Sequence, residues 1–103
     1  MSRFALHPEA YDDIDEARAY VAEDNPDAAD RMVDEIFDRI RQLVSFPDQG
    51  FRRPNITSLP LRFVTVRDYL IAYAPEKKPL WVLAVFHGRR SPRVIAAILR
   101  SRE

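Results

Sequence analysis

The spacing of apolar positions changes about halfway along the chain. In the first half, apolar residues recur every three or four positions, as they do in amphipathic helices. This pattern predicts one helix over residues 8–24. It predicts a second helix over residues 26–46, with Asn25 as its N-cap and Pro26 in its first turn. Each helix has a single apolar stripe, and the connection between them is very short. We therefore expect an antiparallel helical hairpin whose apolar side packs on another layer.

The second half has the shorter period of β-strands. After a loop over residues 48–60, apolar segments follow at residues 61–66, 69–74 and 80–87. In the middle segment Tyr69, Ile71 and Tyr73 alternate with Leu and Ala, so we expect these three side chains on one face of the sheet. The last segment, LWVLAVFH, is apolar up to its histidine, which is typical of a buried strand. It is far shorter than the roughly 20 residues needed to cross a bilayer.

The order of these elements indicates an α+β fold. A short extended segment at residues 3–6 precedes the helical hairpin, and a short helix follows Pro92. The full order is β-α-α-β-β-β-α, with the helices on one face of an antiparallel sheet, because short connections favour antiparallel pairing of the last three strands. A chain of 103 residues with 47% hydrophobic and 31% charged residues is expected to form one domain over residues 1–103.

Charge is distributed unevenly between the two halves, although the net charge of the chain is zero. Residues 1–51 carry 13 Asp and Glu and 5 Arg, a net charge of −8, whereas residues 52–103 carry 11 Arg and Lys and 3 Asp and Glu, a net charge of +8. The two halves either attract each other within the fold or give the second half a basic surface for an anionic partner. The chain has no cysteine, which excludes disulfides and thiolate metal sites. The first residues lack the apolar core of a signal peptide, so we expect a cytoplasmic protein that does not enter a membrane.

The candidate functional residues are arginines of the second half and one histidine. Gly88 follows His87 at the end of the last predicted strand and leads into two arginines. His87 is either a proton carrier or a packed, hydrogen-bonded histidine. Arg62 either meets a partner or pairs with a carboxylate of the first half. The Asp-rich helix face is interpreted as solvated surface, because oxygen-only metal sites need more converging ligands. We expect neither a metal nor a cofactor. The arginines expected to bind a partner are Arg52, Arg53, Arg62, Arg89, Arg90 and Arg93.

Three segments together resemble the RelE/ParE superfamily of bacterial type II toxins. They are the helix NPDAADRMVDEIFDRIRQLVSFPDQG, the hairpin LRFVTVRDYLIAYAP and the strand end VLAVFHGRR. The resemblance implies a toxin that binds a cognate ParD-like antitoxin in a hetero-oligomer. It also implies one of two activities. ParE-like members inhibit DNA gyrase without catalysis of their own, and RelE-like members are ribosome-dependent endoribonucleases that cut mRNA.

The acid–base residues distinguish these two activities. Metal-independent RNA cleavage needs a base for the 2′-hydroxyl, an acid for the leaving oxygen and cations for the charged phosphorane. Arg62 and either Arg89 or Arg90 match positions of RelE-like arginines, and His87 is the only plausible proton carrier in the second half. No Tyr, His or Lys follows Arg90, and arginine is a poor base because it stays protonated. The sequence therefore favours a ParE-like gyrase inhibitor without catalytic residues. The alternative is a RelE-like ribonuclease, with ribosome and mRNA as partners.

Overall fold

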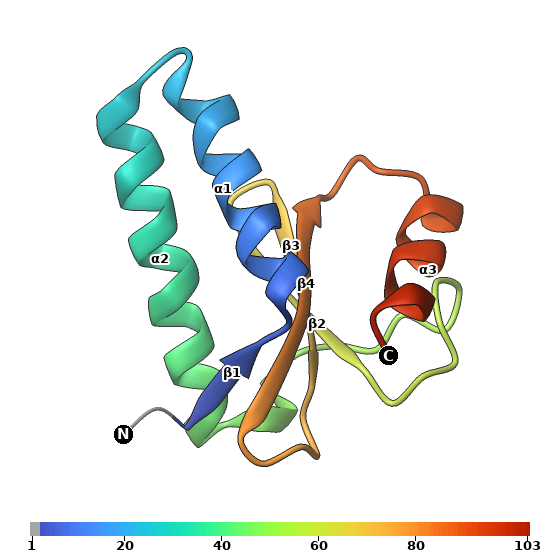
Figure 1. Ribbon diagram of the computed structural model, residues 1–103. Coiled ribbons are helices and arrows are strands. Elements are labelled where there is room, and N and C mark those ends of the chain that lie inside the picture. Colours follow the sequence, from blue (N-terminus) through green and yellow to red (C-terminus); the bar gives the residue numbers. More distant parts are fainter. Residues whose placement is uncertain (1–2) are drawn as a thin grey trace.

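The computed structural model describes residues 3–103 (Figure 1). Two antiparallel helices lie on one side of a sheet, and a third, shorter helix lies on the other side. The elements in chain order are β1 (Phe4–Leu6), α1 (Pro8–Ala22), α2 (Pro26–Ser45), the 3-10 turn η1 (Pro47–Gln49), β2 (Arg62–Val66), β3 (Tyr69–Ala74), β4 (Leu80–His87) and α3 (Pro92–Ser101). The predicted α+β order is confirmed. The structure adds η1, and it ends α1 two residues before the predicted end.

Each helix starts at a proline that follows a side-chain cap. The Asn25 side chain accepts a hydrogen bond from the Ala28 N–H at 3.0 Å, as predicted for an N-cap. His7 caps α1 through its Nδ1, which accepts from the Glu9 N–H at 3.0 Å. Ser91 caps α3 in the same way. Three of the eight prolines thus mark helix starts, because a residue in the first turn needs no N–H donor.

The sheet has the strand order β1-β4-β3-β2 and is mixed. The three consecutive strands β2, β3 and β4 form the predicted antiparallel meander. β1 extends it in parallel, and its three residues pair only with Leu80–Val82 of β4. The edge of β4 beyond Val82 is therefore not covered by β1. Side chains fill this gap, since Asp13 accepts a hydrogen bond from the Val85 N–H at 3.0 Å and Arg102 donates one to the Leu83 carbonyl at 3.1 Å.

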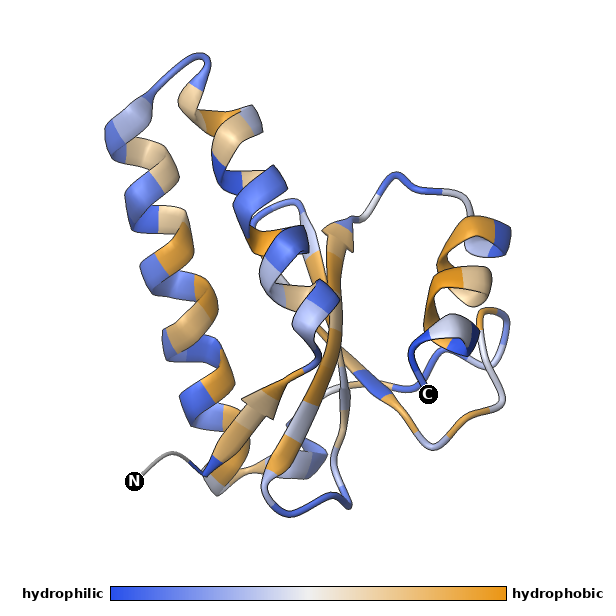
Figure 2. Cartoon of the chain, viewed as in Figure 1, coloured by the Kyte–Doolittle hydropathy of each residue, from blue (hydrophilic) through white to orange (hydrophobic). Residues whose placement is uncertain are grey.

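Apolar side chains cover both faces of the sheet, whereas the sequence predicted helices on one face only. Every residue of β3 is buried, so neither of its faces is open to solvent. Tyr69, Ile71 and Tyr73 share one face of the sheet, as predicted, and this face packs against the helical hairpin. The opposite face packs against α3, through Ile95 and Leu99, and against the loop before β2. Figure 2 shows the matching hydrophobic stripes on the helices. The predicted stripe of α2 is confirmed. In α1 the helical spacing predicts Tyr11 on the apolar stripe, but Tyr11 is half exposed and its neighbour Ala10 is buried instead.

Candidate functional site

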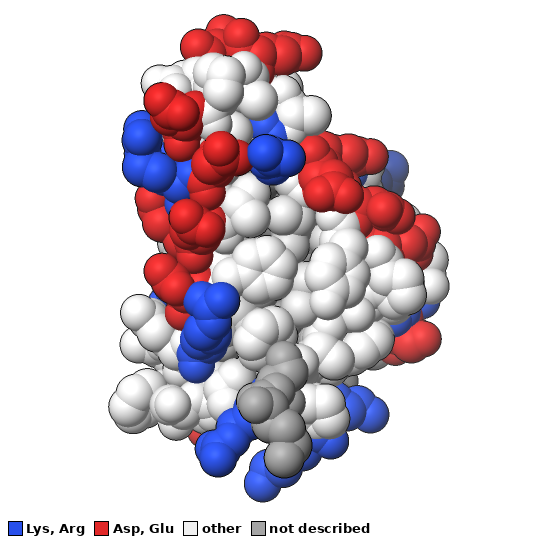
Figure 3. All heavy atoms as spheres, turned by 60° about the vertical axis from the view of Figure 1, so that its left-hand side comes forward, with Lys and Arg blue, Asp and Glu red and all other residues white. Residues whose placement is uncertain are grey.

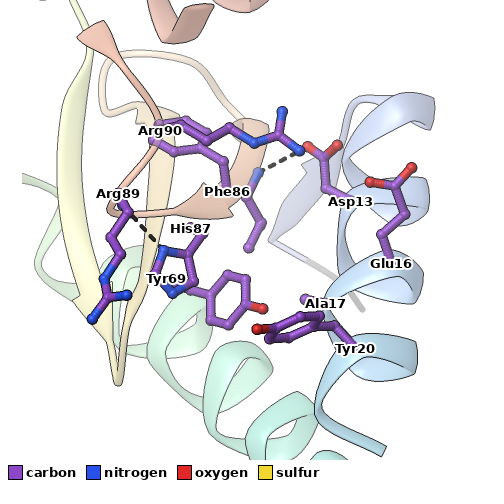
Figure 4. A pocket seen from close by; sticks show the side chains of 10 residues that line it. Asp13, Glu16, Ala17, Tyr20, Tyr69, Phe86, His87, Arg89 and Arg90 are labelled. Carbon is purple, nitrogen blue, oxygen red and sulfur yellow. Dashed lines mark hydrogen bonds between the residues drawn. The ribbon is translucent and has the colours of Figure 1, made fainter. Parts of the chain in front are cut away.

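The end of β4 forms one wall of an open hollow of about 430 Å³, whose opposite wall is α1 (Figure 4). Glu16 and Tyr20 come from α1, and Arg89 and Arg90 come from the segment after β4. Tyr69 lies between these walls, beside Tyr20 in Figure 4. We call this space the α1–β4 hollow. The predicted residues His87, Arg89 and Arg90 all line it, together with Asp13, Ala17, Val85 and Phe86.

His87 is held by two neighbours. Its Nδ1 accepts a hydrogen bond from the backbone N–H of Arg89 at 3.1 Å. Its ring meets Tyr69 edge-on, with ring centroids 5.3 Å apart. Because Nδ1 already accepts a hydrogen bond, only Nε2 is left to exchange a proton with a ligand. The surroundings of His87 are those of a packed histidine.

Tyr69 is a second side chain at this end of the sheet that can carry a transferable proton. Burial raises the pKa of its phenol, and the nearby Tyr20 and Asp68 raise it further. Tyr69 therefore stays neutral at physiological pH and can donate a hydrogen bond, but it does not supply a base.

A second hollow, of about 270 Å³, lies beside the first and shares Tyr69, His87 and Arg89 with it. Arg53 reaches it from the loop before β2, and Arg67 from the turn between β2 and β3. We call this space the arginine hollow. The structure thus brings together Arg53 and Arg89, two of the arginines predicted to bind a partner, from distant parts of the chain.

Arg62 lies away from these residues. It pairs with Tyr73, whereas His87 pairs with Tyr69, which is four residues away along β3, or roughly 13 Å. The Arg62 guanidinium donates to the Gly50 carbonyl at 2.8 Å and lies 3.7 Å from the Asp48 carboxylate. Arg62 therefore fastens the loop after α2 to β2. The other two predicted arginines, Arg52 and Arg93, are exposed and line neither of the two hollows.

Sequence reasoning missed Arg67, whose backbone has a φ of 53°. Its guanidinium donates two hydrogen bonds to the Glu35 carboxylate, at 3.1 and 2.6 Å. This pairing lowers the pKa of Glu35 and raises that of Arg67. The sequence does contain a signal for an unusual backbone at this position. Arg67 and Asp68 form a two-residue turn between two strands, and such turns commonly need a residue with positive φ.

The sequence analysis also missed Arg102, which is buried although it lies one residue from the end of the chain. It forms a two-pronged contact with Asp13, at 2.5 and 3.1 Å. Its charge is stabilised there, because the hydrogen bonds to Asp13 raise the pKa of Arg102. Asp13 is consequently a structural residue, although it lines the α1–β4 hollow.

The arrangement of the carboxylate and imidazole groups and the composition of the helices bear on other classes of function. Within residues 3–103, no group of three or more His, Asp or Glu side chains is arranged to hold a metal ion. The helices of the same region include none with the length and apolar character to span a membrane.

Comparison with known proteins identifies the family. The family described as the ParE toxin of the type II toxin–antitoxin system parDE matches residues 4–92, which is most of the chain. The match covers the helical hairpin and the whole sheet and stops where α3 begins. No curated protein matches the chain in sequence. Members of this family are toxin components of modules that also encode a cognate antitoxin. The chain belongs to the ParE toxin family of type II toxin–antitoxin systems.

Proposed function

We propose that this chain inhibits DNA gyrase without catalysing a reaction of its own, that it acts in the cytoplasm, and that a ParD-like antitoxin neutralises it in a hetero-oligomer. The observation that carries this proposal is the ParE family match over residues 4–92. Family membership identifies a toxin of a toxin–antitoxin module. The proposal adds the target, DNA gyrase, and neutralisation by binding of the antitoxin.

The chemistry around His87 supports a binding surface more than a proton-transfer site. Cleavage of RNA needs a base and an acid on opposite sides of one phosphate. Here one nitrogen of His87 accepts from the Arg89 N–H, and Tyr69 has a raised pKa. Arg62, a candidate for stabilising the transition state, is engaged by the Gly50 carbonyl elsewhere on the sheet. The exposed guanidinium groups of Arg89 and Arg90 are suited to recognition, because arginine presents several fixed donors.

A supercoiling assay tests the proposal. The toxin is separated from its antitoxin, refolded and added to purified gyrase with relaxed plasmid. We expect the parent chain to inhibit supercoiling and an Arg89→Ala/Arg90→Ala double variant to inhibit it less. Arg100→Ala is the matched control, since Arg100 is also exposed but lies on α3, outside both hollows. Unimpaired supercoiling at a large excess of folded parent toxin would refute gyrase as the target.

One observation favours the RelE-like alternative, in which ribosome and mRNA are the partners. His87 and three arginines line the same arginine hollow, which is a composition that can bind a phosphate. Expression in cells followed by mapping of mRNA 5′ ends separates the two activities. Ribosome-dependent cleavage that disappears in the His87→Ala variant would show that the chain is a ribonuclease and not a gyrase inhibitor. Intact mRNA together with unchanged toxicity of His87→Ala would exclude the ribonuclease.

A further inference from the structure

The chain has only two lysines, and they stand together in the turn between β3 and β4. Both Lys77 and Lys78 are exposed. Arg3 lies beside this turn, because Phe4 pairs with Leu80 and the Leu80 N–H donates to the Arg3 carbonyl at 3.0 Å. The three cations therefore gather at the start of β4. The two hollows described above lie at the other end of this strand, roughly 23 Å away.

These cations line a further hollow of about 530 Å³, between the β3–β4 turn and the end of α2. We call it the lysine hollow. The Lys77 N–H donates to the Ala74 carbonyl at 3.3 Å and closes the turn. Val44 from α2, Pro47 from η1 and Leu80 from β4 supply an apolar floor. In Figure 1 these segments meet at the lower end of the molecule. The size and the mixed lining are typical of small-molecule sites, which span about 300–1,000 Å³.

The lining of the lysine hollow has unbalanced positive charge. Within residues 3–103 it includes no Asp or Glu, and neither Arg3 nor the two lysines form an ion pair there. Glu76 belongs to the same turn but does not line the hollow. Lys and Arg side chains also gather at the lower end of the face drawn in Figure 3. Because neighbouring like charges repel, an anion with more than one negative charge is stabilised most at this place.

The charge and the apolar floor together select the class of ligand. A carboxylate carries a single negative charge, whereas a phosphate monoester carries about 1.5 to 2 at pH 7. Lysine binds phosphate as a compact point charge. A phosphodiester within a nucleic acid strand has only one charge and balances the three cations less well. Inorganic phosphate leaves the apolar floor without a partner, but the base of a nucleotide has a flat face that can cover it.

We propose that the lysine hollow binds a nucleotide through its terminal phosphate. The phosphate accepts hydrogen bonds from the ammonium groups of Lys77 and Lys78 and from the guanidinium of Arg3. The base lies on the apolar floor, between Val44 and Leu80. This site goes beyond the proposed function, because it involves neither gyrase nor the antitoxin.

Titration of ¹⁵N-labelled toxin with adenosine 5′-monophosphate at pH 7, observed by NMR, tests the inference. The backbone amides of Lys77 and Leu80 report binding, because both residues line the hollow. We expect both amides to shift with the monophosphate and to stay in place with adenosine, which lacks the phosphate. Inorganic phosphate lacks the base, and adenosine 3′,5′-cyclic monophosphate lacks the second charge. Each should bind about tenfold more weakly than the monophosphate.

Substitution of the lysines should weaken binding of the monophosphate. In Lys77→Gln/Lys78→Gln we expect the Kd to rise by about a hundredfold, tenfold for each lost charged hydrogen bond, with the Leu80 amide as reporter. Arg3→Gln should raise it by about tenfold, and it keeps the experiment decisive if the double variant does not fold. Arg31→Gln/Arg100→Gln is the matched control, because it also removes two exposed cations but neither lines this hollow. Its Kd should equal that of the parent.

Several outcomes would overturn the inference. They are an unmoved Leu80 amide, equal binding of adenosine, and an equal loss of affinity in the control variant. Tighter binding of acetyl-Ala-Glu-Ala-amide would assign the hollow to an acidic peptide instead, and tighter binding of an eight-nucleotide single strand would assign it to a nucleic acid backbone. The supercoiling assay measures gyrase alone, so a negative result there would leave the nucleotide site standing, and the two proposals fail separately.

Discussion

Tyr73 shows how one side chain organises the chain between the helical hairpin and the sheet. It is fully buried, yet its hydroxyl has two partners: it donates to the Pro47 carbonyl at 2.6 Å and accepts from the Gly50 N–H at 2.9 Å. Gly50 is needed for this approach, because an added Cβ would lie 2.5 Å from the hydroxyl and 2.8 Å from the Phe63 carbonyl oxygen. The hydroxyl therefore fixes the path of the loop after α2.

Replacing Tyr73 with phenylalanine should lower stability without changing the fold. The substitution leaves the Gly50 N–H and the Pro47 carbonyl without their partner, at a cost of about 1–3 kcal/mol in the free energy of unfolding. Urea denaturation measures this difference. Tyr20→Phe is the control, since the Tyr20 side chain is 67% exposed and should tolerate the change. Equal stability of the Tyr73→Phe variant and the parent would contradict the role given to the hydroxyl.

The buried tyrosines also predict how stability depends on pH in the alkaline range. Burial raises the pKa of Tyr69 and of Tyr73, so the folded chain holds these protons more tightly than the unfolded chain. Their contribution to stability is complete below the unfolded pKa of about 10 and is lost as pH rises through the folded pKa. The urea midpoint should fall above pH 10, and it should fall less steeply in Tyr73→Phe. Identical pH profiles for parent and variant would show that Tyr73 does not contribute.

At the scale of elements, α3 depends on an ion pair at its end. Besides the apolar contacts of Ile95, Ile98 and Leu99, α3 is attached through the adjoining Arg102, which reaches Asp13 on α1 and the Leu83 carbonyl on β4. The side chains of Arg102 and Asp13 are 9% and 16% exposed. This contact joins three elements that are distant in the sequence.

Replacing Arg102 alone should lower the free energy of unfolding by more than the loss of its hydrogen bonds, because it also leaves a carboxylate unpaired. Arg102→Met leaves the Asp13 carboxylate shielded and unpaired, which costs about 3 kcal/mol in the free energy of unfolding. Adding Asp13→Asn removes the unpaired charge, so the double variant should be less destabilised than the two single variants combined. Thermal unfolding of the four proteins gives the coupling energy. Strict additivity of the two substitutions would mean that the pair contributes nothing beyond packing.

The elements differ in how far the sequence predicts them. β3 and β4 were predicted to the residue, because their apolar runs are bounded by polar turns. The parallel pairing of β1 was not, since it depends on contacts between residues 4–6 and residues 80–82, which lie far apart in the sequence. At the candidate site, His87, Arg89 and Arg90 were found from their position after a buried strand. Arg67 and Arg102 were not, because their partners Glu35 and Asp13 lie far away in the sequence.

At the scale of the whole molecule, the fold partly neutralises the opposite charges of the two halves. Ion pairs with Glu35, Asp48 and Asp13 engage three basic residues of the second half. Asp and Glu side chains remain gathered over the helical hairpin, around an uncharged patch (Figure 3). The hairpin is therefore the acidic part of the surface, and Arg89 and Arg90, just after β4, border it across the α1–β4 hollow.

Such a divided surface predicts that binding of the cognate antitoxin depends on salt. Complementary charges speed association, and salt screens them as the Debye length shortens from about 10 Å at 0.1 M to about 3 Å at 1 M. The association rate in stopped-flow mixing should therefore fall steeply with NaCl, and the dissociation rate should change much less. An association rate that does not vary with salt would show that these charges do not guide the encounter.

The short length of β1 has a consequence for the toxin without its partner. A strand whose edge groups are unpaired is a template on which other chains aggregate. β4 continues for five residues past its last pair with β1, but its Leu83 carbonyl and Val85 N–H are bonded to Arg102 and Asp13. These two side chains leave an incoming strand fewer groups to pair with. We therefore expect Arg102 and Asp13 to disfavour edge-to-edge pairing of toxin molecules along β4.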